Sequence, residues 1–183
     1  MRSSGFCDVQ FAGGMASAGW KTRRVGATDD ARVSIYEVAG GRPAMLALAA
    51  AHHARCLADH ELNHPFSHES VDPDHVAHLA EYWGEVLGGP RLYSDRHGSQ
   101  TMLLTMHAGN GDLTDLGQRF VDCFVAAMDD AGLPTDARLR TAMRDYMEWA
   151  VADMIAYPDE DSVVPTGLPV PRWSWNGLVS AGD

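Results

Sequence analysis

The feature that most constrains the fold of this chain is the breaker Gly88-Gly89-Pro90. It ends an apolar stretch with helical spacing, because glycine and proline are poorly tolerated inside a helix. A polar connector carrying Tyr93 follows, and a short apolar run at 102–106 then leads to His107. The pattern predicts two helices separated by a connector, with one histidine presented at the end of the second helix.

The same helical spacing recurs along most of the chain. Ser34 and Glu37 have the spacing of a capping box, which predicts a short helix ending at the glycines 40–41. Further helices are expected over about 43–58, 74–87, 101–107, 113–131 and 136–157, where apolar residues recur at three- and four-residue steps. No β-type alternation persists, so the predicted fold class is all-α.

Two of these helices have a predicted inward face. In the helix at 43–58 it consists of Met45, Leu48, Ala49, His52 and Cys56. In the helix at 74–87 it consists of His75, Leu79, Tyr82 and Val86. The expected organisation is a flexible extension over 1–33, a helical domain over 34–157, and an irregular Pro/Trp-rich extension over 158–183 whose Trp173 and Trp175 pack on the domain.

Composition excludes several classes of partner. A formal net charge of -11 disfavours nucleic acid, since phosphates require a basic face. No apolar run reaches roughly 18 residues and the N-terminus lacks a secretory pattern, so neither a membrane partner nor export is expected. The three cysteines form no closely spaced pair, which favours a cytoplasmic location.

A histidine set in apolar residues beside a breaker-rich loop suits an iron porphyrin, which requires apolar surface and one neutral imidazole. By itself, the same pattern is also that of a core histidine. The chain has nine histidines, and all of them lie from position 52 to position 107. A non-haem metal site built from His60, His64, His68 and His97 stays open, but it lacks tight ligand spacing, so solvated loop histidines are expected.

Several motifs coincide along the chain. They are SIYEVAGG at 34–41, HHARCLAD at 52–59, HPF at 64–66, GGPRLYS at 88–94, and Phe120 thirteen residues after His107. Together they resemble the truncated haemoglobins of group II over about residues 34–157. The resemblance implies a two-over-two helical sandwich around haem b (iron protoporphyrin IX), with His107 as the proximal iron ligand.

The resemblance also implies the other walls of the haem site. The residues that it places against the haem are Phe66, His75, His78, Leu79, Tyr93 and Phe120. Met106, in the apolar run before His107, is a further candidate for contact with the haem. Tyr93 would contact a propionate, and Phe120 would close the distal side.

Two departures from the family pattern concern the distal side. His53 stands where group II members usually have a tyrosine, and Phe120 stands where they usually have a tryptophan. Imidazoles would thus replace a phenol and an indole as hydrogen-bond donors. His53 and His75 are the candidate distal groups, and direct ligation of the iron by one of them at rest stays open.

The function implied is binding of a diatomic gas (oxygen, carbon monoxide or nitric oxide) by a cytoplasmic haem protein. Peroxidase or nitric oxide dioxygenase activity stays open. It would need an external reductase, because the sequence has no flavin or nicotinamide fingerprint. A homodimer is compatible with the sequence. The alternative from another class is a cofactor-free helical interaction module that uses the Trp173/Trp175 tail.

Overall fold

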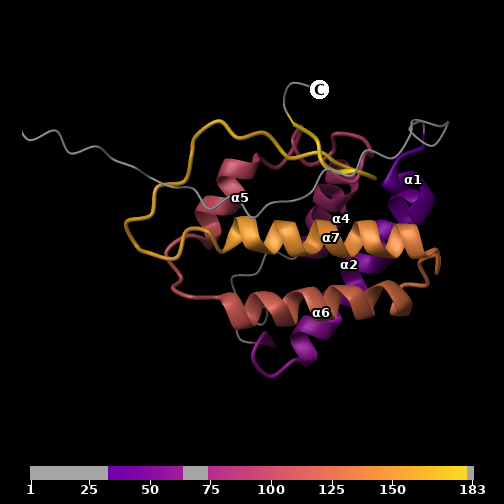
Figure 1. Cartoon of the computed structure of the whole chain (residues 1–183), viewed down its shortest axis with the longest axis horizontal. Coiled ribbons are helices and arrows are strands. Elements are labelled where there is room, and N and C mark those ends of the chain that lie inside the picture. The colour runs from indigo at the N-terminus through magenta and orange to yellow at the C-terminus, as the bar shows by residue number, and fades with distance from the viewer. Residues whose placement is uncertain (1–32, 64–73, 181–183) are drawn as a thin grey trace, which may run out of the picture.

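The computed structural model describes residues 33–63 and 74–180, and the regular structure in this part of the chain is almost entirely helical (Figure 1). Its elements are α1 (Ile35–Ala39), α2 (Gly41–Ala58), α4 (His75–Val86), α5 (Gln100–His107), α6 (Thr114–Asp130), α7 (Ala137–Met154), β1 (Trp173–Ser174) and β2 (Gly177–Leu178). Helix α2 packs on α4 and α6, and α6 packs on α7. Two helical pairs thus form a sandwich, as predicted. The extension predicted over 1–33 lies almost wholly outside the described residues.

The start of the domain is fixed by a capping box at α1, as predicted. The amide of Glu37 donates to Ser34 Oγ (3.2 Å), and the amide of Ser34 donates to the Glu37 carboxylate (2.8 Å). The amide of Tyr36 donates to the carbonyl of Leu87 (3.0 Å), which joins α1 to the end of α4. At that junction Gly88 has φ +100°, and a Cβ there would lie 2.7 Å from the Cβ of Ser34. The glycine breaker therefore lets two helix ends meet.

The core confirms one predicted helix face and extends the other. The five residues predicted for α2 are its buried ones: Met45, Leu48, Ala49, His52 and Cys56. In α4 the prediction was incomplete, because His75 and Leu79 are only half-buried. The second half of α4 is buried all round, from Ala80 to Val86. Neighbouring elements enclose this half, so its helical period no longer separates a core face from a solvent face.

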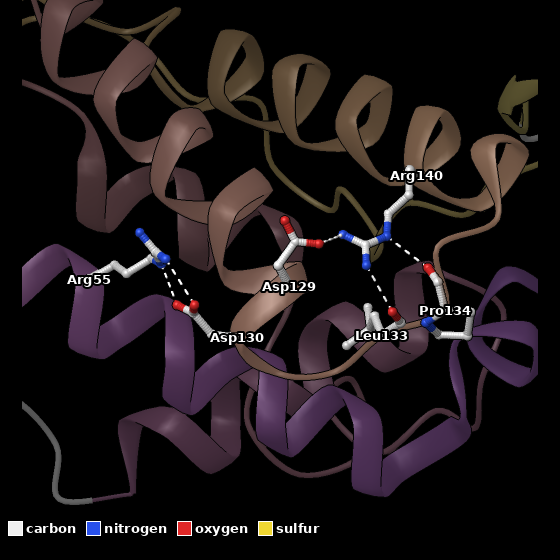
Figure 2. Close-up of polar contacts among 6 residues, drawn as sticks. All are labelled: Arg55, Asp129, Asp130, Leu133, Pro134 and Arg140. Carbon is white, nitrogen blue, oxygen red and sulfur yellow. Dashed lines mark hydrogen bonds and ion pairs between the residues drawn. The ribbon is translucent and has the colours of Figure 1, made fainter.

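Polar contacts join the helices at the surface (Figure 2). Arg55 of α2 holds the Asp130 carboxylate of α6 with two N–H groups, and this contact lowers the pKa of Asp130. Arg140 of α7 donates to Asp129 (2.6 Å) and to the carbonyls of Leu133 (2.8 Å) and Pro134 (2.7 Å). The α6–α7 turn is thereby fixed to α7.

Three local predictions need correction. Helix α7 ends at Met154 rather than 157, because Pro158 disfavours helical backbone at the residue before it. Helix α6 is one residue shorter at each end than the predicted 113–131, with Leu113 as its N-cap, and Asp112 accepts the amide of Thr114 (2.9 Å). The C-terminal extension is not wholly irregular, since β1 and β2 pair antiparallel.

Trp173 and Trp175 pack on the domain, as expected. Trp173 is 6% exposed, and its indole N–H donates to the carbonyl of Ala142 (3.2 Å). The indole N–H of Trp175 donates to the carbonyl of Val33 (2.8 Å). Among the described residues, no helix is both long enough and apolar enough to span a bilayer.

Candidate functional site

The proximal candidate, His107, is the last residue of α5. Ser99 caps this helix by accepting the amide of Met102 (3.4 Å). Nδ1 of His107 lies 2.8 Å from the carbonyl oxygen of Leu103. Because a carbonyl oxygen can only accept, Nδ1 carries the proton and donates it, and in the neutral imidazole this leaves the lone pair on Nε2. The ring is thus held in the tautomer and orientation of a metal ligand.

The face of α5 that carries His107 is apolar and open. Met102 is 43% exposed and Met106 is 63% exposed, although both are large apolar side chains. They lie one helical turn apart and flank Leu103 and His107, which are also one turn apart. Apolar surface around one available imidazole nitrogen matches what the sequence analysis required for a porphyrin.

The two distal candidates come together from different helices. The ring centroids of His53 on α2 and His75 on α4 are 5.4 Å apart. Nδ1 of His53 and Nε2 of His75 are shielded from solvent. The two imidazoles, separated by more than twenty residues in the sequence, therefore form one feature of the α2–α4 interface. Leu79 lies one turn along α4 from His75 and is half-buried.

His52, the neighbour of His53, points the other way and is part of the core. It is fully buried, and its Nε2–H donates to the carbonyl of Phe120 (3.3 Å). Its ring makes edge contacts with Phe120 (4.3 Å between centroids) and Trp83 (5.4 Å). Burial lowers the pKa of His52 from 6.5 to about 4, so the ring is neutral near pH 7. His52 thereby positions Phe120, the residue predicted to close the distal side.

Tyr93 and His78 lie in a second polar group. The His78 ring is 3.9 Å from that of His97, and Tyr93 is 5.7 Å from His97. His97 Nε2 lies 3.0 Å from the Glu81 carboxylate, with its side chain 25% exposed. Tyr93 is buried, and burial raises the pKa of its phenol, which keeps the hydroxyl protonated.

The loop histidines did not all behave as predicted. The expectation that His97 is a solvated loop residue was wrong, because the buried carboxylate of Glu81 attracts it. His60 is solvated as expected, with its side chain 95% exposed. His64, Phe66 and His68 lie outside the described residues. Within residues 33–63 and 74–180, no group of three or more His, Cys, Asp or Glu side chains could hold a metal ion.

Comparison with known proteins gives one family and a set of solved structures. The model of the family described as bacterial-like globin matches residues 34–155. The haemoglobin of the actinobacterium Thermobifida fusca is 28% identical with a TM-score of 0.57, covering 69% of this chain and 99% of that one. The haemoglobin of Chloroflexus aurantiacus is 28% identical with a TM-score of 0.55, covering 67% and 98%.

Group II haemoglobins have the same fold. The group II 2-on-2 haemoglobin of Agrobacterium tumefaciens is 24% identical with a TM-score of 0.57, covering 71% of this chain and 99% of that one. At this identity the likeness concerns the fold alone. No curated protein sequence matches the chain.

Proposed function

The chain belongs to the bacterial-like globin family, and on that premise we propose that it holds haem b through His107 and binds a diatomic gas at the haem iron. Family membership and the similar haemoglobins support haem-based ligand binding. The observation that carries the proposal is the hydrogen bond from His107 Nδ1 to the Leu103 carbonyl, because it leaves Nε2 as an available ligand on an apolar face.

The residues near His107 and Tyr93 also suit a bound haem. Met102 and Met106 offer apolar surface beside His107 that would otherwise contact water. Tyr93 keeps a protonated hydroxyl, which suits donation to a propionate. The haem supplies a reducible iron centre that binds oxygen, carbon monoxide or nitric oxide. The protein would hold the macrocycle, orient one imidazole and set the hydrogen-bond donors on the opposite side.

His53 and His75 are our candidates for those distal donors. They are neighbours across the α2–α4 interface, with ring nitrogens shielded from water. In a dry site an N–H donor stabilises a partly negative gas ligand more strongly than in water. Phe120 has no polar atom on its side chain. The two imidazoles would therefore donate the distal hydrogen bonds that an indole and a phenol donate in group II relatives.

Redox chemistry is a second part of the proposal. An imidazole can accept and return a proton near neutral pH, as cleavage of the O–O bond of peroxide requires. The close His53–His75 pair supports this assignment. Rapid autoxidation of the oxygenated protein together with peroxide turnover is the expected result. A slowly autoxidising protein without peroxidase activity would refute the redox part and leave gas binding in place.

Absorption spectra of the purified full chain test the haem assignment. The expected result is a Soret band in the ferric and ferrous states, a shift of that band with carbon monoxide, and one iron per chain. A colourless, iron-free protein that stays folded would refute the proposal and favour an interaction module. Iron without porphyrin absorbance would also refute it and favour a non-haem site.

A further inference from the structure

The residues that follow α7 are tied to the first turn of α5. Thr101 Oγ1 donates to the carbonyl of Pro165 (2.8 Å) and accepts the amide of Leu168 (3.0 Å). One hydroxyl thus satisfies two backbone groups of a segment more than sixty residues away. We call residues 157–180 the C-terminal strap. Figure 1 shows its course from the end of α7, past α5, and back towards the α1 side of the molecule.

The same strap contacts the chain just beyond the other end of α5. The amide of Gly109 donates to the carbonyl of Tyr157 (2.9 Å), and the amide of Gly111 donates to the carbonyl of Pro158 (2.9 Å). His107 therefore lies between two points at which the chain is hydrogen-bonded to the strap, through the Thr101 side chain on one side and through backbone amides on the other.

The far end of the strap is fixed on α7 and at the start of the domain. The buried Trp173 ring lies 5.9 Å from Tyr146 and 5.6 Å from Trp149, measured between ring centroids. The Arg138 guanidinium stands 4.4 Å from the centroid of Trp175. Because these contacts hold the strap, its bonds to α5 are made to a fixed support.

Helix α5 has few other constraints on its position. Only Gln100 and Leu104 of its eight residues are buried. Gln100 accepts from the hydroxyl of Tyr82 (2.6 Å) and donates to Asp153 (2.8 Å). A short helix with so little buried apolar area depends on its polar contacts for its placement.

We propose that the C-terminal strap positions the proximal histidine, with Thr101 as the positioning residue that links the strap to α5. The inference rests on the proposed function, since it assigns the strap a role in placing His107 against the haem iron. A displacement of α5 along or around its axis moves the His107 ring with it, because the Leu103 carbonyl holds that ring to the helix.

The test compares Thr101→Val, Thr101→Ser and Thr105→Val in the full chain loaded with haem. Valine keeps the shape of threonine but leaves the Pro165 carbonyl and the Leu168 amide without the hydroxyl, whereas serine retains it. Thr105 is the matched control, because its hydroxyl donates to Thr101 of its own helix (2.7 Å) and makes no strap bond. Circular dichroism verifies that each variant is folded.

The readouts are the iron–histidine stretching band in the resonance Raman spectrum of the ferrous protein and the rate of haem transfer to an acceptor apoprotein. For Thr101→Val we expect a shifted or broadened band and haem transfer faster by roughly twofold to tenfold. Thr101→Ser and Thr105→Val should match the wild type. An unchanged band in Thr101→Val, or an equal change in Thr105→Val, would overturn this inference alone. A wild-type protein without an iron–histidine band would overturn the proposed function and this inference together.

Discussion

The buried, neutral His52 predicts that the protein loses stability in mild acid for an identifiable reason. Its pKa in the folded chain is about 4, against 6.5 in an ordinary environment. Burial is the main cause. The nearby His53 and His75 lower the pKa further, while the bond to the Phe120 carbonyl opposes the shift. Between these two pKa values the unfolded chain therefore binds a proton at this position, whereas the folded chain keeps the ring neutral.

The sign and size of the effect follow from proton linkage. Because the folded state binds fewer protons between the two pKa values, the free energy of unfolding falls as the pH falls through this window. The full effect is about 3 kcal/mol, from the difference of the two pKa values at about 1.4 kcal/mol per unit. Between about pH 7 and about pH 4.5 the loss should be about 2.5 kcal/mol.

Urea unfolding of the wild type and of His52→Gln across this range isolates the effect. Glutamine does not titrate and can still donate to the Phe120 carbonyl, so the variant retains the acid response of every other group. We expect the wild type to lose about 2.5 kcal/mol more than the variant on acidification. Parallel curves for the two proteins would refute the assignment of His52 as a buried neutral residue. Titration of the His52 ring by NMR would locate its pKa directly.

Three further predictions concern the distal side, a thiol and the glycine breaker. His75→Leu should speed oxygen dissociation by roughly tenfold to a hundredfold in stopped-flow measurements, since one partly charged hydrogen bond is lost; an unchanged rate contradicts the distal role. Burial raises the pKa of the Cys56 thiol. Alkylation of Cys56 near pH 8 should therefore be at least about a hundredfold slower in the folded protein than in urea. Equal labelling of the folded and unfolded protein in mass spectrometry would disprove this. Gly88→Ala should lower the free energy of unfolding by about 1–3 kcal/mol, because φ there is +100° and the new methyl meets Ser34; a melting temperature equal to that of the wild type would refute it.

Features coded by near neighbours in the chain were predictable. The capping box at Ser34 and Glu37 and the buried face of α2 are set by residues three or four positions apart, and the structure confirms both. The His107 ring needed only an acceptor, and α5 itself supplies one in the Leu103 carbonyl. Local structure thus explains how the ring is oriented, whereas the assignment of His107 as the iron ligand came from the family resemblance and stays a prediction.

Features that depend on distant partners were not predictable. Nothing in the helical spacing singled out Glu81, yet it is buried, and its carboxylate contacts Arg96 and His97 of the following connector. The bonds of Thr101 to the C-terminal strap join positions more than sixty residues apart. Helical or strand periodicity does not predict such a contact, because it needs only one hydroxyl and two backbone groups and no repeated residue spacing.

The absorption spectrum of His107→Gly tests the central claim most directly. Haem is added to the wild type, to this variant and to His60→Gly, whose imidazole is solvated in the described structure. We expect the Soret band of the wild type in His60→Gly, and its loss or displacement in His107→Gly, with recovery when free imidazole is supplied to the vacated position. A His107→Gly protein with the wild-type spectrum and no response to imidazole would contradict the assignment of His107 as the iron ligand.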